Sequence, residues 1–492
     1  MELLAETDCA VVSESEVLGR SRADQDTRID RIKSLASIDQ SHATESTREI
    51  LDALISREAR YINSFLTTNP NYQREIAESL EDTAGNSFSF SDLNAGLART
   101  LVISYAFPPT LDTSALAMAR RVRKWAKPVS VISNDLSETH KTYAEGLKLT
   151  DPFVERYVTL QAPPNFLNWA DVSKFISLGL DYTGNNEQWF RQHDTIYSHA
   201  NPAASHFLAV LLKTKYPDKK WIAEFSDPLI RNVENTLRYL KIDDPGNDAV
   251  LDQLRRLIAS VNLTELAGDN LFQWGELLAY AYADEIVFAN DHQRRYMIDY
   301  LDDPILTDRV EQISYADEYP SPPIGFYSAA NPPFELDPTK INIGFFGYVY
   351  MFRRLTELTD ALSTLSPEEI DQFEIHFVGP NAESVLETTG IDTASLNIVC
   401  HPPVSYFESL ALQRQFDCVI VNDAETKDTF PINPYLPSKI SDASNNLIKV
   451  WAITEPGSLL DTKQVEFKSI VGDETGAREV LDQLLKIRSS RP

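Results

Sequence analysis

The chain has few cysteines and fewer basic than acidic side chains. Its three cysteines, Cys9, Cys400 and Cys418, lie far apart and show no Cys-x-x-Cys spacing, so neither a disulfide framework nor a cysteine-based zinc module is indicated. Lys and Arg number 45 against 73 Asp and Glu, and the resulting formal net charge of −28 repels nucleic-acid phosphates and anionic lipids. We therefore expect a reducing, cytoplasmic environment and no nucleic-acid partner.

Long apolar runs and common cofactor motifs are missing as well. No run approaches the roughly 20 apolar residues of a membrane span, and the first residues lack the basic and apolar regions of a signal peptide. The patterns G-x-x-x-x-G-K-[ST], G-x-G-x-x-G, G-x-S-x-G and H-E-x-x-H do not occur, which argues against an ATPase, a dehydrogenase, an α/β-hydrolase and a zinc peptidase. We expect a soluble protein without bound metal or cofactor, which contacts a membrane only peripherally through a local patch.

The length of 492 residues exceeds one typical domain, whereas 43% hydrophobic and 24% charged residues are ordinary for a globular protein. Between residues 28 and 80 apolar side chains recur at steps of three and four, which predicts helices. We therefore assign residues 1–95 to a helical N-terminal extension. Its helices either pack on the main body, pair between subunits of a homo-oligomer, or are partly mobile, and the pattern does not choose between these.

After residue 99 short apolar runs alternate with helical stretches, which is typical of βαβ units and parallel sheets. Prolines concentrated between positions 314 and 340 indicate an interdomain connection. The predicted fold class is thus α/β, with two Rossmann-like parallel-sheet domains at 96–335 and 336–475 and a closing helix at 476–492. The strands are expected at 101–105, 129–132, 195–198, 221–225, 285–289, 341–347, 373–379, 397–400, 417–421 and 449–453.

Parallel-sheet domains bind ligands at the carboxyl ends of their strands, and a cleft between two domains is the usual place for a substrate. Three segments of the first domain follow predicted strands in this way. They are Ile-Ser-Tyr-Ala-Phe-Pro-Pro-Thr-Leu-Asp-Thr-Ser-Ala at 103–115, Tyr-Ser-His-Ala-Asn-Pro at 197–202 and Trp-Ile-Ala-Glu-Phe-Ser-Asp-Pro-Leu at 221–229. The first leads into a helix whose N-terminal N–H groups and positive dipole end are expected to face a ligand.

Candidate side chains in these three segments are Pro109, Thr113, Ser114, His199 and Asp227. His206 is a less favoured candidate, because a histidine inside a helix is equally explained as a core residue. The basic run 120–127 is predicted to be a solvated helix face rather than a membrane or phosphate contact. Glu276 either faces the cleft or belongs to a helix whose aromatic side chains are core.

Two segments of the second domain carry the remaining candidates. The first, Ile-Gly-Phe-Phe-Gly-Tyr-Val-Tyr-Met-Phe-Arg-Arg-Leu at 343–355, contains Gly347, Arg353 and Arg354. The second, Asn-Pro-Tyr-Leu-Pro-Ser-Lys-Ile-Ser-Asp at 433–442, contains Ser438, Lys439 and Asp442, and its Pro-Ser pair opens a predicted helix.

In this order the five segments resemble motifs of retaining glycosyltransferases of the GT-B fold, specifically the family 4 group, over roughly residues 99–460. The family patterns are "Y-x-F-P-P", "D-x-I-Y-S-x-x-P-P-x-S-x-H", "W-[IV]-A-D-F-R-D-P-W", "G-x-x-G-x-x-Y-x-x-R-[RS]-L" and "L-P-S-K-[LI]-x-[ED]". The chain departs from them where Thr113, Ser114 and Ala115 replace glycines, where Asp442 replaces a glutamate, and in the turn at 445–449.

The resemblance implies that the second domain binds a nucleoside-diphosphate-sugar as substrate and that the first presents a hydroxyl of a carbohydrate or lipid-linked acceptor, with retention and without a metal. A guanidinium and an ammonium offset the charge of the departing diphosphate, which assigns Arg353 and Lys439 to catalysis. Gly347, Arg354 and Ser438 would complete the diphosphate site, and Asp442 would bind the ribose. His199 and Asp227 would contact the acceptor or the reacting sugar, beside the loop of Pro109, Thr113 and Ser114.

Two alternatives keep the same fold. A nucleotide-sugar epimerase or hydrolase would form its product without an acceptor, but no pair of carboxylates is evident for that chemistry. A non-catalytic scaffold partner of another transferase would explain the altered loops at 113–115 and 445–449. The pathway expected from the resemblance is polysaccharide or glycoconjugate synthesis.

Overall fold

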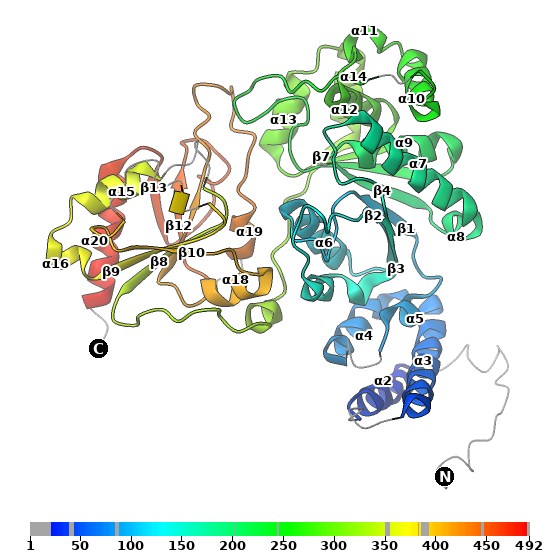
Figure 1. Cartoon of the computed structure of the whole chain (residues 1–492), viewed down its shortest axis with the longest axis horizontal. Coiled ribbons are helices and arrows are strands. Elements are labelled where there is room, and N and C mark those ends of the chain that lie inside the picture. The colour runs from blue at the N-terminus through cyan, green and yellow to red at the C-terminus, as the bar shows by residue number, and fades with distance from the viewer. Residues whose placement is uncertain are drawn as a thin grey trace.

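The computed structural model describes residues 21–38, 44–83, 88–200, 202–243, 246–349, 355–381, 383–384, 393–443 and 447–489. These residues form two parallel-sheet domains, with a group of helices attached to the first domain (Figure 1). The α/β class, the two parallel-sheet domains and the N-terminal helical extension predicted from the sequence are therefore confirmed.

The first domain is built on a seven-stranded sheet with the strand order β3-β2-β1-β4-β5-β6-β7. All of its strand pairs are parallel. Apolar residues alternate between its two faces, so that Leu101 and Ile103 belong to one core and Val102 to the other. The strands are β1 (Thr100–Ser104), β2 (Val129–Asn134), β3 (Val154–Leu160), β4 (Thr195–Ala200), β5 (Lys220–Phe225), β6 (Glu285–Phe288) and β7 (Ser314–Ala316).

The second domain has a six-stranded sheet with the order β10-β9-β8-β11-β12-β13, again parallel throughout. Both sheets reverse their strand order beside the first strand, and such a reversal opens a crevice at the carboxyl ends of the strands. The strands are β8 (Ile341–Phe346), β9 (Phe373–Val378), β10 (Ile398–His401), β11 (Cys418–Asn422), β12 (Val450–Thr454) and β13 (Phe467–Ile470).

Every predicted strand segment coincides with a strand of the structure, and three further strands were not predicted. Those three, β3, β7 and β13, all lie at sheet edges. Edge strands are short or carry polar side chains on their exposed side, so they lack the continuous apolar run by which the central strands are recognised.

Helices cover both faces of both sheets (Figure 1). In the first domain α7, α9, α10, α12 and α13 contribute to one core and α6 to the other. In the second domain α15 and α20 cover one face, and α18 and α19 the other. The helices of the two domains are α6 (Thr113–Trp125), α7 (Trp169–Asn185), α8 (Glu187–Arg191), α9 (Ala204–Lys215), α10 (Ala249–Ser260), α11 (Thr264–Ala267), α12 (Leu271–Tyr282), α13 (Asp291–Asp299), α14 (Pro304–Ile313), α15 (Thr356–Ser363), α16 (Pro367–Ile370), α18 (Tyr406–Gln413), α19 (Lys439–Ala443) and α20 (Glu474–Ser489).

The N-terminal extension packs on the main body, which is one of the three arrangements that the sequence left open. It consists of α2 (Arg22–Ala36), α3 (Glu45–Thr68), α4 (Gln73–Ser79) and α5 (Phe90–Asn94). Its apolar side chains share one core with Met118 and Val122 of α6 and with Val131 of β2. The extension thus completes the face of the first sheet that α6 covers only in part.

None of the helices formed by the described residues is both long and apolar enough to cross a membrane. Of the described cysteines, Cys400 is half-buried and Cys418 is buried.

Two buried histidines of the first domain predict a loss of stability in acid. Burial lowers the pKa of His193 to about 4 and that of His206 to about 3, whereas an unfolded chain takes up these protons below about pH 6.5. Since only the unfolded state gains the protons, the stability is fully present above pH 6.5 and is lost as the pH falls from 6.5 towards 4. We expect each histidine to cost about 2 kcal/mol of unfolding free energy at pH 5.

Urea unfolding at pH 7 and pH 5 checks this prediction. The variant His206→Leu should lose about 2 kcal/mol less than the wild type between these pH values. If His206→Leu loses as much unfolding free energy as the wild type between pH 7 and pH 5, His206 is not a source of the acid sensitivity.

Candidate functional site

A cavity of about 540 Å³ lies between the two domains, at the carboxyl ends of both sheets. The start of α13 contacts the segment before α19 at the cavity wall: Asn290 Nδ2 donates to the carbonyl of Pro434 (3.0 Å), and His292 Nδ1 contacts that of Asn433 (3.1 Å). The lining is rich in hydroxyl and other polar groups and is formed by Asp112, Thr113, Ser114, Ala117, Ser226, Asp227, Val233, Arg238, Ala289, Asn290, Tyr319, Pro434, Tyr435, Leu436, Pro437, Ser438 and Ser441.

The first turn of α6 contributes Thr113 and Ser114 to the cavity wall. The side chain of Asp112 caps this helix by accepting from the backbone N–H groups of Ser114 (2.8 Å) and Ala115 (3.3 Å). The expectation that these N–H groups are open to a ligand is therefore wrong, because the chain's own carboxylate occupies the helix end. Pro109 does not belong to the cavity lining, and its carbonyl accepts from the N–H of Tyr143 (2.8 Å).

His199 lies at the end of β4, directly behind the cavity wall. Its ring is fully buried and contacts two residues that line the cavity, the Ser114 hydroxyl at Nδ1 (3.3 Å) and the Tyr319 hydroxyl at Nε2 (3.1 Å). Burial and the charge of Arg121 lower the pKa of His199, against the opposing charges of Glu224 and Asp112. The ring is thus held neutral and reaches the cavity through the two hydroxyls rather than directly.

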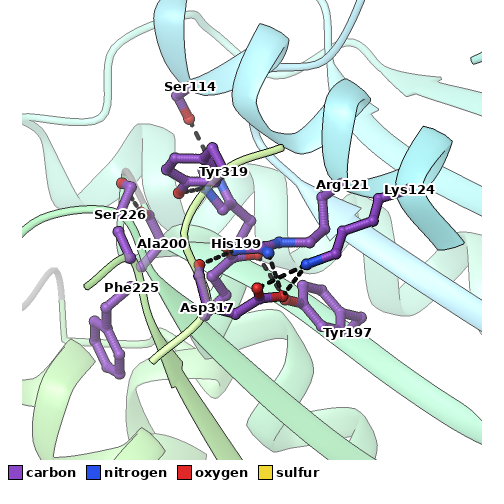
Figure 2. A network of polar contacts seen from close by, with 12 residues as sticks. Ser114, Arg121, Lys124, Tyr197, His199, Ala200, Phe225, Ser226, Asp317 and Tyr319 are labelled. Carbon is purple, nitrogen blue, oxygen red and sulfur yellow. Dashed lines mark hydrogen bonds and ion pairs between the residues drawn. The ribbon is translucent and has the colours of Figure 1, made fainter. Parts of the chain in front are cut away.

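Arg121 of α6 is the centre of a buried polar network beneath this wall (Figure 2). Its guanidinium donates twice to Glu224 Oε1, from Nε (3.2 Å) and Nη2 (2.6 Å), and both side chains are almost completely buried. It also donates to Asp317, which Lys124 contacts too, and it lies 5.0 Å from the ring centre of Tyr319. Burial acts to raise the pKa of Glu224, but Arg121 and further hydrogen bonds hold it below its ordinary value.

The arginines of the basic run 120–127 do not lie on a solvated face, which corrects that prediction for them, whereas Lys124 and Lys127 are exposed. Arg120, Arg121 and Arg123 are 3%, 1% and 8% exposed. Each pairs with a carboxylate from a different part of the chain: Arg120 with Asp442 of the second domain, Arg121 with Glu224 and Asp317, and Arg123 with Glu81 of the extension. The helical period shows which residues share a face, but not that carboxylates distant in sequence meet them there.

Asp227 lies just beyond β5, is exposed to the cavity and forms part of its wall together with Ser226. The loop that follows is anchored by Glu276 of α12, which is fully buried. Its Oε1 accepts from the N–H groups of Leu229 (2.8 Å) and Ile230 (2.9 Å), and the Tyr300 hydroxyl donates to the same carboxylate. Glu276 therefore does not line the cavity but fixes the loop that carries Asp227.

In the second domain Gly347, Ser438 and Lys439 come together. Gly347 has φ of +102°, and a Cβ atom built on it would lie 3.1 Å from Lys439 Nζ. This ammonium also lies 5.0 Å from the ring centre of Phe345. Ser438 belongs to the cavity lining, one residue before α19 begins.

Asp442 is engaged between the domains. Its Oδ1 accepts from Arg120 Nη1 (2.8 Å) and from the Tyr406 hydroxyl (2.8 Å), and its backbone carbonyl accepts from the Tyr327 hydroxyl. Burial raises the pKa of Asp442, against Arg120, Tyr406 and Lys439, which lower it. Asp442, which the sequence predicted to bind the ribose, is thus already bound by a side chain of the first domain.

Gly347, Lys439 and Asp442 do not belong to the cavity lining, and the remaining predicted residues lie elsewhere or cannot be placed. Arg353 and Arg354, and part of the altered turn at 445–449, lie outside the described residues. His206 is a core residue, with Nδ1 bonded to the Ser198 hydroxyl (2.8 Å) and its ring packed on Phe225. Within the described part of the chain, no group of three or more His, Cys, Asp or Glu side chains is placed to hold a metal ion.

Three residues of the site were missed or underrated from the sequence. Tyr319 comes from the proline-rich connection, where it carries no motif. Glu224 was noted only as part of a predicted strand, although a charged residue within a central buried strand indicates a buried partner of opposite charge. Glu455 anchors the second domain's loop, because it accepts from the N–H groups of Thr426 and Lys427 and from Asn433 Nδ2 (2.8 Å).

No protein-family model matches the chain, and a search of curated proteins finds no match either. The chain is similar in outline to several solved structures. One is Alr3699/HepE of Anabaena in complex with UDP and glucose, with 12% identity, coverage of 79% of this chain and 90% of that one, and a TM-score of 0.45.

A second is a glycosyltransferase of Rickettsia africae, with 13% identity, coverage of 79% of this chain and 89% of that one, and a TM-score of 0.47. A third is the catalytic domain of starch synthase IV of Arabidopsis thaliana bound to ADP and acarbose, with 10% identity, coverage of 81% of this chain and 93% of that one, and a TM-score of 0.48. A likeness of this degree gives no information about the reaction, so the function has to be argued from the residues of this chain.

The network around Arg121 makes a prediction about stability. The variant Arg121→Met leaves the buried carboxylate of Glu224 without its cation, and we expect it to lower the unfolding free energy by about 3–5 kcal/mol. The matched control is Lys220→Met, which breaks an ion pair with Glu285 whose side chains are 45% and 35% exposed, and which should cost less than about 1 kcal/mol. Urea unfolding followed by far-UV circular dichroism measures both.

The double variant Arg121→Met/Glu224→Leu should recover part of the loss, because a buried ion pair replaced by apolar groups is often tolerated. Equal costs for Arg121→Met and Lys220→Met would contradict the role given to the buried pair.

Proposed function

We propose that the protein is a glycosyltransferase that moves a sugar from a nucleoside-diphosphate-sugar to an acceptor hydroxyl. The observation that carries this proposal is the interdomain cavity, where Asp227 and the hydroxyls of Ser114 and Tyr319 face Ser438 and Ser441 across a space of about 540 Å³. A wall of hydroxyls and carboxylates suits a sugar, since such groups can donate to and accept from its hydroxyls.

The second domain would bind the donor. Gly347, with positive φ and a Cβ position filled by the Lys439 side chain, brings main chain and ammonium together where a diphosphate would bind. Lys439 would offset the negative charge that builds on the departing diphosphate. Arg353 and Arg354 would add to this site as the family resemblance implies, and Ser438 would donate a hydrogen bond to it.

The first domain would hold the acceptor. Asp227 is the carboxylate of this wall that lies on a loop fixed from behind, by Glu276, and such support holds a reacting group in one geometry. Retention of the anomeric configuration, a reaction without a metal, a carbohydrate or lipid-linked acceptor and a role in polysaccharide or glycoconjugate synthesis are further parts of the proposal, and they rest on the family resemblance.

A ligand screen tests the donor site. A nucleoside diphosphate that binds only the folded protein raises the melting temperature, so UDP, GDP, ADP, dTDP and CMP and their common sugar conjugates are compared by thermal shift. We expect the nucleotides of one base to raise the melting temperature. Lys439→Ala should weaken the binding of that nucleotide about 10- to 100-fold, since hydrogen bonds to charged groups contribute about 1.5–3 kcal/mol.

Lys463→Ala is the matched control, because it removes an ammonium that pairs with Glu318 (2.7 Å) and does not contact Gly347. If both variants weaken nucleotide binding equally, the donor site assigned to Lys439 is wrong. If the folded protein responds to no nucleotide, the proposal is overturned and the scaffold alternative is favoured. Conversion of the bound nucleotide-sugar without any acceptor would favour an epimerase or a hydrolase instead.

A further inference from the structure

We propose that Ser114, His199 and Tyr319 form a proton relay whose two ends open into the interdomain cavity. The relay deepens the proposed function, on which its place in the reaction rests. It would connect the acceptor hydroxyl to the departing group through a histidine that touches neither of them.

The geometry of the relay is a chain of two hydrogen bonds (Figure 2). Ser114 Oγ lies 3.3 Å from His199 Nδ1, and the Tyr319 hydroxyl lies 3.1 Å from His199 Nε2. The imidazole between them is fully buried, whereas both hydroxyl residues line the cavity. The two ring nitrogens are therefore each bonded to a group that reaches the substrate space.

The surroundings keep the imidazole neutral. The charges of Arg121 of α6, of Glu224, which lies beside His199 on the neighbouring strand β5, and of Asp112 at the start of α6 act on it. Burial and Arg121 lower its pKa, and together they outweigh the two carboxylates. A neutral imidazole carries one N–H donor and one lone pair, so that it accepts a proton at one nitrogen only if it releases the proton at the other.

A hydroxyl can donate to or accept from either form of the ring. In one arrangement Ser114 donates to Nδ1, and Nε2–H donates to Tyr319, whose own proton points towards the cavity. In the other arrangement Tyr319 donates to Nε2, and Nδ1–H donates to Ser114. The two arrangements differ by the position of one proton, and both satisfy every group of the chain.

Passing from the first arrangement to the second supplies acid and base chemistry to a glycosyl transfer. Starting with the proton on Nε2, the acceptor O–H gives its proton to Ser114 Oγ as its oxygen bonds to the anomeric carbon, and Ser114 gives its own proton to Nδ1. Nε2–H passes to Tyr319, whose hydroxyl proton goes to the diphosphate oxygen that leaves the same carbon. The imidazole is neutral before and after, and one proton has moved from acceptor to leaving group.

Tyr319 suits the donor end because its phenol stays protonated. Burial and the negative charges of Glu224 and Asp227 raise its pKa well above the ordinary value, against Arg121 and Arg120. The ring also lies over the Arg121 guanidinium (5.0 Å), which fixes its position independently of the hydroxyl. Tyr319→Phe therefore removes the relay's end while keeping the ring in place.

Nitrogen NMR of ¹⁵N-histidine-labelled full-length protein at pH 7 tests the relay without a substrate. We expect intermediate ¹⁵N shifts for both ring nitrogens of His199, identified by their loss in His199→Gln, because two tautomers are populated. Tyr319→Phe should move the proton to Nδ1 and Ser114→Ala should move it to Nε2, since a buried unpaired N–H is the costlier defect. His206 is the internal control: its Nδ1 is bonded to Ser198, but its Nε2 has no hydrogen-bond partner among the described residues, so one tautomer is expected.

A charged ring, or a single tautomer that neither substitution changes, would overturn the relay whether or not the protein binds nucleotides. On the nucleotide-sugar that stabilises the protein, Tyr319→Phe should lower turnover about 100-fold with nucleotide affinity retained. Tyr197→Phe is the matched control: it removes a buried phenol that donates to Glu224 (2.6 Å) in the same network, away from the cavity. It should lower the melting temperature without lowering turnover, and equal losses of turnover in both variants would also overturn the relay.

Discussion

The arrangement of the molecule depends on the pairing of buried cations along one helix, α6. Removing a guanidinium from water costs several kcal/mol unless a carboxylate and further hydrogen bonds compensate it, so each arginine of this helix requires its partner in place. The partners come from the first sheet, from the second domain and from the N-terminal extension, through Glu224, Asp442 and Glu81. One helix thereby fixes the positions of three parts of the chain relative to one another.

The first residues of α6 form part of the cavity wall, so the contacts that stabilise this helix also position residues of the site. Ser114 stands at its first turn and Arg121 two turns later, so the network that holds the helix also sets the hydroxyl that faces the cavity. Ala119 adds an apolar contact to the core of the second domain. Loops on both sides of the cavity are fixed in a related way, by the buried carboxylates of Glu276 and Glu455, which accept from backbone N–H groups. The site is thus supported by groups that do not touch a ligand.

The sequence predicted the parts of this structure that depend on local pattern. The central strands are apolar on both faces, and all of them were predicted. The end of β5 and the predicted start of the helix at 438 placed Asp227 and Ser438 at the cavity. Contacts between distant segments were not predictable, because no periodicity shows that Arg120 would meet Asp442 more than 300 positions away. Tyr319 was missed for the same reason: it comes from a proline-rich connection and acquires its role only when that connection passes over β4 and α6.

Asp442 links donor binding to the arrangement of the domains. Its Oδ1 accepts from Arg120 of the opposite domain and from Tyr406 of its own domain. Under the proposed function a ribose would bind a carboxylate whose orientation Arg120 has already set, and an oriented group loses less entropy on binding than a mobile one. The donor site is then complete only while α6 lies against the second domain. Since α6 also carries Ser114, donor and acceptor groups are positioned together by the same contact, which is what a transfer between two substrates requires.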